Sequence, residues 1–478
     1  MLFNSIDFAV FLPLVFALYW AFGGERRQLQ NVLIVIASYV FYGWWDPRFL
    51  ALIAFSTLVD YGIGLALGKR ANPKERKYLL WTSIVVNLGL LGFFKYYNFF
   101  IANFTEAFSF LGKEIQPNTL HIILPVGISF YTFQTLSYTI DVYRQRLGPT
   151  KDFIAFAAFV SFFPQLVAGP IERASHLLPQ FQTRREFKYQ KSVDGLRQIL
   201  WGLFKKIVIA DNCAQFANTI FEHHTEHSGS TLFLGAIFFA FQIYGDFSGY
   251  SDIAIGTARL FGFDLMQNFA TPYFSRDIAE FWRRWHISLS TWFRDYVYIP
   301  LGGSRGSKGQ VLRNVLVIFL VSGFWHGANW TFLVWGGLNA AYFLPLILLK
   351  QHRKHTEVVA QGQLLPNFRE CWQMGSTFLL TVVAWVFFRA ASVTEALSYL
   401  KGVFSASLFS IPEIRPSFLL VLLGLFVLVE WRGREGRYAI EHLWFRYPKA
   451  LRWGLYYVIA MVIFLYGGKE QEFIYFQF

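Results

Sequence analysis

The feature that most constrains this chain is a succession of apolar blocks, many of them long enough to cross the hydrocarbon layer of a membrane. A transmembrane helix needs roughly 20 mostly apolar residues, and 55% of the 478 residues are hydrophobic whereas only 15% are charged. The runs do not alternate between apolar and polar residues as membrane β-strands do. The candidate segments lie near residues 6–22, 31–45, 48–68, 79–99, 120–141, 153–169, 196–215, 231–248, 311–326, 330–349, 374–391, 417–430 and 451–467. We therefore expect an all-α, polytopic membrane protein.

Basic residues gather in short clusters between the apolar blocks, as cytoplasmic loops require. Placing every cluster in the cytoplasm gives about twelve crossings with both termini outside. Residues 153–169 then have basic clusters on both sides, and Pro164 and the Gly169-Pro170 pair interrupt a helix there, so this block is expected to re-enter rather than cross. The clusters are Arg26-Arg27, Lys69–Lys77, Arg144–Lys151, Arg184–Lys191, Arg276–Arg313, Lys350–His355 and Arg432–Arg437.

Composition excludes several other classes of protein. The net charge of +13 comes from basic residues in these clusters, which we interpret as topology signals. Membrane lipid is therefore the expected partner of these residues, and no nucleic-acid partner is expected. Cys213 and Cys371 have no paired spacing, which excludes a disulfide framework or a thiolate metal site. Asp7 stands where a secretory signal would carry a basic residue, so we interpret the first block as a retained helix. We find no repeat or linker, and predict one membrane domain over residues 1–478.

Most polar residues at membrane depth fall between residues 241 and 339, and such residues mark functional sites. The window opens with a glycine-rich segment that carries Asp246, Ser248 and Tyr250. An aromatic and basic stretch follows, for which two readings stay open: an interfacial helix with arginines near anionic lipid, or the wall of a cytoplasmic opening for a phosphate-bearing donor. The candidate donor-binding or catalytic residues of that stretch are Arg283, Arg284, His286, Arg294 and Asp295.

The last part of the window places His326 in the segment FWHGANWTFLVWGGLNA. A lone histidine among aromatic residues is more typical of a structural hydrogen bond to a neighbouring helix. Here, however, Trp325, Asn329 and Trp330 supply shape and donors, and nearby glycines allow helices to approach closely. The glycines are Gly323, Gly327, Gly336 and Gly337. We therefore predict a buried polar pocket at His326 and no metal site.

A buried neutral imidazole is suited to remove a proton from a hydroxyl group that attacks an activated carbonyl. Amide or indole donors, such as those of Asn329 and Trp330, would stabilise the charge on the carbonyl oxygen. The residues alone leave two alternatives: a proton-coupled transporter that uses His326, Asp246 and Asp252 as a relay, and a non-catalytic scaffold of a secretion complex. Direct transfer is the simpler mechanism, and a ping-pong route remains open.

Several segments together resemble the membrane-bound O-acyltransferase family, within it the alginate O-acetyltransferase-like subgroup that modifies exported polysaccharides. They include SYVFYGWWD, FFPQLVAGPIER, YGDFSGYSDIAIG, EFWRRWHISLSTWFRDYVYIPLGG and FWHGANWTFLVWG, and the ending FIYFQF is similar as well. The resemblance implies that His326 is the catalytic histidine and His286 the second required position. It also implies membrane helices around a central tunnel that joins a cytoplasmic donor to an acceptor on the other side.

From the resemblance we expect an acetyltransferase of the cell inner membrane. The donor is expected to be acetyl-CoA or another acyl thioester, used as a substrate, with no bound cofactor. The acceptor is expected to be an alginate-like polysaccharide, reached with the help of a periplasmic or secreted acetyltransferase partner. Transfer of another acyl group or of D-alanine to a different cell-envelope polymer is the alternative within the same family.

Overall fold

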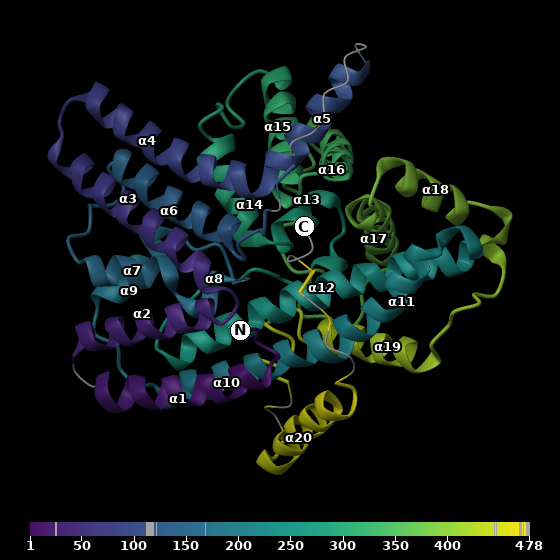
Figure 1. The fold of residues 1–478 in the computed structure, drawn as a ribbon. Helices are drawn as coiled ribbons and strands as arrows, with labels where there is room; N and C mark the ends of the chain where they lie inside the picture. The colour runs from purple at the N-terminus through teal and green to yellow at the C-terminus, as the bar shows by residue number, and fades with distance from the viewer. Residues whose placement is uncertain are drawn as a thin grey trace. The chain divides into compact units, whose positions relative to one another are not determined.

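The computed structural model describes residues 1–23, 26–110, 119–120, 122–167, 169–443, 445, 447–467, 471 and 473–474. Regular structure in these ranges is entirely helical, without a strand (Figure 1), which confirms the predicted fold class. The chain forms two compact units. Unit 1 comprises Met1–Ser192 with Thr257–Leu265, and unit 2 comprises Val193–Gly256 with Met266–Phe478.

Unit 1 is built from the first helices of the chain. Its helices are α1 (Ile6–Gly23), α2 (Arg27–Gly43), η1 (Pro47–Phe49), α3 (Leu50–Lys69), α4 (Pro73–Leu91), η2 (Gly92–Tyr96), α5 (Tyr97–Phe110), α6 (Ile128–Tyr143), α7 (Phe153–Ser161), α8 (Phe163–Leu166) and α9 (Ala174–Gln182). Helices α3, α4 and α6 lie side by side (Figure 1). Buried polar groups join them, because the Asp60 carboxylate on α3 accepts hydrogen bonds from Ser83 (2.6 Å) and Asn87 (2.9 Å) on α4.

The block that the sequence predicts to re-enter is broken into two short helices. Helix α7 ends at Ser161, and α8 begins at Phe163, after one intervening residue, with Pro164 in its first turn. The pair α7–α8 rises by about 20 Å at 1.5 Å per residue, less than the roughly 30 Å of hydrocarbon. The interruption at Pro164 is thus confirmed, and these helices are too short for a straight crossing.

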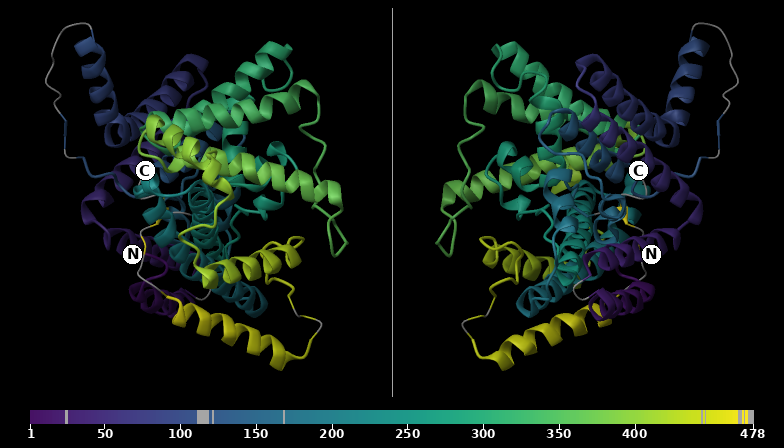
Figure 2. Two further views of the ribbon diagram at one scale, coloured as in Figure 1. Left: turned by 90° about the vertical axis from the view of Figure 1, so that its right-hand side faces the viewer. Right: turned by 90° about the vertical axis from the view of Figure 1, so that its left-hand side faces the viewer.

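Unit 2 holds the remaining helices, including most of two that run across the boundary between the units. They are α10 (Tyr189–Leu203), η3 (Phe204–Ala210), α11 (Asp211–Glu222), η4 (His224–Glu226), α12 (Gly229–Leu260), η5 (Pro272–Phe274), α13 (Ile278–Arg284), α14 (Ile287–Phe293), η6 (Arg294–Tyr298), α15 (Lys308–His326), α16 (Trp330–Leu348), α17 (Phe368–Arg389), α18 (Val393–Val403), η7 (Ala406–Phe409), α19 (Ser417–Arg432) and α20 (Lys449–Leu465). Figure 2 shows α15 and α16 in green, packed against each other, and α17 packs against α16.

Five helical stretches of the described chain are long and apolar enough to cross a membrane: Pro47–Lys69, Pro73–Phe110, Gly229–Leu260, Trp330–Leu348 and Phe368–Arg389. The figure of about twelve crossings, like the central tunnel, stays a prediction. One boundary differs clearly from the expectation. The sequence suggested that an apolar block ends near residue 248, whereas α12 continues to Leu260, so its polar residues lie on a buried helix rather than after one.

Candidate active site

His326 is the last residue of α15 and lies in a cage of aromatic rings. Its side chain is buried. The ring centroids of Trp325, Trp335 and Phe388 lie 4.9, 5.1 and 5.3 Å from that of the imidazole. Helices α15, α16 and α17 each contribute one of these rings. His326 is therefore buried, as the sequence predicted, but the rings around it are aromatic and apolar, whereas the sequence predicted a polar pocket.

Glycines allow α15 and α16 to come close enough to form this cage. A Cβ atom at Gly323 would overlap the Phe332 carbonyl oxygen, and one at Gly336 would overlap the Phe319 carbonyl oxygen. Gly327 meets the Phe332 ring in the same way. Gly337 has open space around it, so the expectation that it permits close approach is wrong. Its Cα faces away from the contact, because one residue along a helix turns the direction by about 100°.

His286 lies between α13 and α14, and its imidazole approaches that of His326. The two ring centroids are 6.5 Å apart, and Phe247 of α12 packs edge-on against His286 at 4.6 Å. His286 has a φ of +44°, in the left-handed region that non-glycine residues rarely adopt. Such strain persists where the surroundings hold it, and it often marks functional sites.

Asn268 holds the turn that carries His286. Its carbonyl oxygen accepts from the Ile287 backbone N–H (2.9 Å), and its side-chain oxygen accepts from the Ser288 hydroxyl (2.9 Å). Its amide nitrogen donates to the Ser251 hydroxyl of α12 (3.0 Å). Asn268 is fully buried. The sequence did not indicate this role, because Asn268 lies 18 positions before His286 and no local motif links the two.

His286 is a neutral group in this setting. It lies outside the helices that are long enough to cross a membrane, and burial lowers its pKa to about 3. A neutral imidazole has one donor and one acceptor nitrogen, so it can donate a hydrogen bond or accept a proton without carrying a charge beforehand. Two adjacent histidines in an apolar cage can therefore act on one substrate, the first as a base and the second as a donor.

The predicted donors Asn329 and Trp330 stand at the start of α16. Asn329 caps α16, because its side-chain oxygen accepts from the Thr331 N–H (3.1 Å) and its amide nitrogen donates to the Ala391 carbonyl (2.8 Å). The Trp330 side chain is 56% exposed at the start of α16. The structure thus does not bring either residue into the cage around His326. The local sequence was misleading here because an Asn at a helix start is also a common capping residue.

The arginines of the aromatic and basic stretch divide between two roles. Arg283 donates to the carbonyls of His352 (2.8 Å) and His355 (2.5 Å), and Arg284 pairs with Glu280 at 2.9 Å. Both therefore fix the loop and helix around them rather than face an open pocket. Arg294 is exposed and contacts Asp295 at 2.7 Å.

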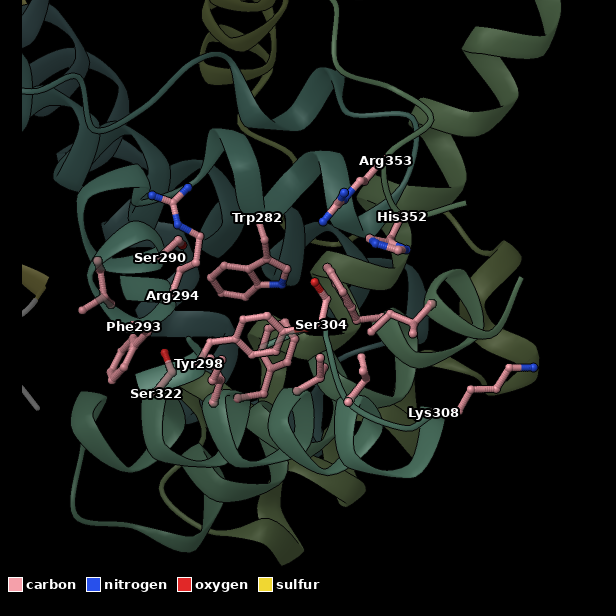
Figure 3. A pocket seen from close by; sticks show the side chains of 18 residues that line it. Trp282, Ser290, Phe293, Arg294, Tyr298, Ser304, Lys308, Ser322, His352 and Arg353 are labelled. Carbon is pink, nitrogen blue, oxygen red and sulfur yellow. The ribbon is translucent and has the colours of Figure 1, made fainter. Parts of the chain in front are cut away.

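A cavity of about 430 Å³ opens between α13, α14, η6, α15 and α16 (Figure 3). Its size lies within the roughly 300–1,000 Å³ of ligand pockets. The lining residues are Trp282, Leu289, Ser290, Phe293, Arg294, Tyr298, Ser304, Gly306, Lys308, Val311, Val315, Ile318, Phe319, Ser322, Phe343, Ile347, His352 and Arg353. In Figure 3 the Trp282 indole lies between the side chains of Arg294 and Arg353. Of the predicted donor-binding residues, only Arg294 lines this cavity.

The cavity is connected to the histidines through shared elements. Ser322 lines it and lies one helical turn before His326 on α15, so both side chains share a face. The Trp282 ring packs against Trp335 at 5.6 Å, and Trp335 packs against His326. Arg353, whose cluster the sequence indicated only as a topology signal, adds positive charge to the cavity. Lys308 also lines the cavity, but its ammonium points away from the other lining side chains (Figure 3).

The predicted residues of α12 lie in a buried charge network. The carboxylate of Asp246 pairs with Lys206 (2.8 Å), and that of Asp252 pairs with Lys205 (2.5 Å). Asp246 also accepts from the backbone N–H of Ile474 (2.7 Å). These carboxylates therefore neutralise buried lysines and anchor a distant segment, which differs from direct donor binding. Ser248 is buried on the same helix.

Tyr250 connects that network to the end of the described chain. The Phe473 ring packs against Tyr250 in a tilted arrangement, with centroids 4.3 Å apart, and contacts Phe247, the neighbour of His286, at 6.1 Å. Phe473 is completely buried. Of the FIYFQF motif, Phe473 is thus separated from His286 by the Phe247 ring and Ile474 bonds Asp246, whereas the last four residues lie outside the described residues. Only the family resemblance of the motif hinted at this position.

No group of three or more His, Cys, Asp or Glu residues in the described ranges is placed to hold a metal ion. The loop histidines include His223, whose Nδ1 lies 3.7 Å from Glu226. The acidic and basic groups near the candidate active site pair with one another instead.

Comparison with known proteins gives a consistent result. A model of the membrane-bound O-acyltransferase family matches residues 143–375. A Pseudomonas aeruginosa protein named "Probable alginate O-acetylase AlgI" is 43% identical over 419 residues, which cover 87% of this chain and 77% of that protein. The Helicobacter pylori peptidoglycan O-acetyltransferase is 37% identical over 432 residues, covering 84% and 80%. The Bacillus subtilis teichoic acid D-alanyltransferase is 28% identical over 232 residues, covering 46% and 58%.

Proposed function

The chain belongs to the membrane-bound O-acyltransferase family, and from this premise we propose that it transfers acetyl groups towards the hydroxyl groups of an exported, alginate-like polysaccharide. Relatives named for O-acetylation of alginate and of peptidoglycan are 43% and 37% identical over most of the chain. The relative named for D-alanyl transfer is 28% identical and covers about half of it. Similarity therefore favours an acetyl group over D-alanine.

The observation that carries this proposal is the pair of buried imidazoles. His326 and His286 lie 6.5 Å apart between ring centroids, in an aromatic cage whose Trp335 contacts Trp282 in the wall of a cavity bearing positive charge. A cage with two imidazoles fits proton transfer to and from an acyl group. A transporter relay through Asp246 and Asp252 fits less well, since lysines neutralise both carboxylates.

In the reaction we assign the role of general base to His326. As the acceptor hydroxyl oxygen bonds to the acetyl carbon, His326 takes the hydroxyl proton, and the bond between the carbonyl carbon and sulfur breaks. The thiolate that leaves accepts that proton and departs as a thiol. Neutral His286 donates a hydrogen bond to the carbonyl oxygen while that oxygen carries negative charge. Apolar walls strengthen both effects, because electrostatic interactions grow when water is excluded.

Acetyl-CoA, or another acyl thioester with a phosphate-bearing carrier, is the proposed donor. Arg294 and Arg353 supply guanidinium groups to the 430 Å³ cavity, and Trp282 offers an aromatic face (Figure 3). Guanidinium groups suit phosphates, and the apolar interior suits an uncharged thioester arm. Ser322 and Trp282 support a path from this cavity to His326.

The setting that we propose is the cell inner membrane. The basic residues of Arg276–Arg313 favour a cytoplasmic position for the donor cavity by the positive-inside rule. The acceptor would then be served from the opposite side. The proposed partner is a periplasmic or secreted acetyltransferase that passes the acetyl group on to the polysaccharide. The same centre therefore allows two routes, direct transfer to the polymer and transfer through this partner.

Replacement of His326 by Ala tests the catalytic assignment. A strain that carries the His326→Ala variant is expected to produce polymer without acetyl groups while the variant inserts in the membrane at the wild-type level. His442→Ala is the matched control, because the His442 side chain is 76% exposed and lies on unit 2 as well. Normal acetylation with His326→Ala would refute the assignment.

Labelled acetyl-CoA, offered to either face of vesicles in which the protein has a known orientation, tests the side from which the donor binds. Label is expected to reach the acceptor only when acetyl-CoA is on the cytoplasmic face. Transfer from the other face alone would overturn cytoplasmic binding without affecting the role of His326.

A further inference from the structure

Unit 1 contains a second cavity, lined only by its own residues. It has a volume of about 460 Å³ and is formed by the end of α1, by α9, by the extended segment 183–188, by the first turn of α10 and by residues 259–264. None of the residues discussed for acyl transfer lines it. Its most distinctive property is charge, because five lining residues are Lys or Arg and two are acidic. The basic residues are Arg184, Arg185, Lys188, Lys191 and Arg259.

Arg185 provides a fixed positive charge at the wall of this cavity. Its guanidinium is buried, and it donates to the Tyr19 hydroxyl (2.6 Å), the Asn31 side-chain oxygen (2.7 Å) and the Gln180 carbonyl (3.0 Å). Each of these partners in the described chain is a neutral oxygen. Neutral dipoles orient the guanidinium without cancelling its charge, so an anion in the cavity would be attracted to it.

Lysines at the rim extend this positive charge to the surface. Lys188 is exposed, and Lys191 is half-exposed and pairs with Asp264 at 2.7 Å. Glu186, the other acidic lining residue, is exposed. The excess of basic over acidic groups favours an anion with several acceptor oxygens, such as a phosphate.

Hydrogen bonds between neutral groups form the frame of the cavity in advance. The Gln180 side chain donates to the Asp264 carbonyl and accepts from the Asp264 N–H, both at 2.9 Å. The Trp20 indole N–H donates to the Leu260 carbonyl at 3.1 Å. A site whose walls are already bonded to one another loses little conformational entropy when a ligand binds.

Apolar surface adjoins the basic rim. The rings of Trp20 and Phe187 are in contact with centroids 5.5 Å apart, and Phe187 is 50% exposed. Leu18 and Phe22 on α1 are also exposed. Aromatic residues gather at the level of lipid headgroups, and apolar helix faces contact acyl chains. A soluble phosphate compound would use only the charged half of this surface, whereas a phospholipid would use both halves.

We propose that this cavity is a binding site for the phosphate headgroup of an anionic phospholipid. The phosphate lies near Arg185 and Lys188, and the acyl chains lie along the exposed face of α1. Basic pockets at the cytoplasmic ends of membrane helices suit this chemistry, and the Arg184–Lys191 cluster is one of those expected in the cytoplasm. The site is independent of the acyl-transfer proposal, because it shares none of its residues.

The test measures thermal unfolding of the purified full-length protein with increasing dioctanoyl phosphatidylglycerol. A saturable rise of the unfolding midpoint is expected, because a ligand that binds only the folded state stabilises it. Dioctanoyl phosphatidylcholine and inorganic phosphate at the same concentrations are expected to leave the midpoint unchanged. A Lys188→Gln/Lys191→Gln variant is expected to weaken the apparent affinity by about 25-fold, since each of the two basic residues near an anionic lipid contributes roughly fivefold.

Lys74→Gln/Lys77→Gln is the matched control. It removes the same charge from two exposed lysines of α4 in the same unit, and neither lines the cavity. This variant is expected to bind phosphatidylglycerol as the wild type does. An equal loss of affinity in both double variants would overturn the proposal, since it would indicate a general effect of net charge. An equal rise with phosphatidylcholine or inorganic phosphate would overturn it too.

Discussion

Replacing Asn268 by Ala is the perturbation that most specifically tests how His286 is held. The side chain joins α12 to the turn before α14, with hydrogen bonds of 2.9 Å to the Ser288 hydroxyl, 3.3 Å to the Ser288 N–H and 3.0 Å to the Ser251 hydroxyl. All three residues are buried. Loss of hydrogen bonds to buried polar groups costs about 1–3 kcal/mol per orphaned group, so we expect the variant to lose roughly 2–5 kcal/mol of unfolding free energy.

The same substitution is expected to lower the rate of transfer. His286 has a φ of +44°, and the left-handed conformation costs roughly 1–2 kcal/mol in a non-glycine residue. Without the Asn268 side chain, the turn is free to relax away from it. Because a displacement of about 1 Å at a reacting centre costs on the order of 100-fold, kcat per folded molecule should fall by about that factor. The KM for acetyl-CoA should change little, since Asn268 does not line the donor cavity.

The assay is steady-state release of thiol from acetyl-CoA by purified protein, with the folded fraction measured in parallel. Asn87→Ala is the control, because Asn87 in unit 1 is also buried and its amide also makes several hydrogen bonds to buried groups, among them the side chains of Asp60, Ser56 and Thr135. It should destabilise the protein to a similar degree but leave kcat per folded molecule near the wild-type value. If both variants lose kcat equally, or if Asn268→Ala retains it, the positioning role is refuted.

Other predictions address the donor cavity, the helix pair and the anchored segment. Arg353→Gln should raise the KM for acetyl-CoA several-fold and leave kcat nearly unchanged, because one rim cation is lost away from the reacting atoms; an unchanged KM in a thiol-release assay would contradict this role. Gly336→Val should destabilise the protein by roughly 1–3 kcal/mol, measured by thermal unfolding, because its side chain would overlap the Phe319 carbonyl; wild-type stability would count against the close approach. Asp246→Asn should make the segment around Ile474 more accessible to carboxypeptidase, because the hydrogen bond from the Ile474 backbone N–H to residue 246 weakens. Digestion of the variant at the wild-type rate would exclude the anchoring role of Asp246.

The sequence predicted the class of fold because membrane helices follow from local composition. The start of α16 at Trp330 coincides with the expected start of its apolar block. The break at Pro164 was also readable, since proline lacks the backbone donor that a continuous helix needs. By contrast, the second half of α12 contains polar residues, so its composition did not indicate a continuing membrane helix. The helix continues through Asp252 because these residues are buried within unit 2.

The centre around His326 was readable in part. Aromatic residues and glycines near His326 in sequence are also near it in space, since α15 and α16 form a tight pair. The partners of Asp246 were not readable, because Lys206 and Ile474 lie far away in the chain and no motif joins them. Asn329 shows a different limit: its side chain suits either an oxyanion or a helix start, and only the structure shows that it caps α16.

The most direct test of the account is single-turnover acetyl transfer by the reconstituted protein. Wild-type protein, mixed with acetyl-CoA and excess acceptor, should release one thiol for each acetyl group transferred. His326→Ala should bind acetyl-CoA with wild-type affinity, because His326 does not line the donor cavity, yet release thiol at least 100-fold more slowly, as loss of a general base predicts roughly 10²–10⁴-fold. Wild-type transfer rates in His326→Ala would contradict the account.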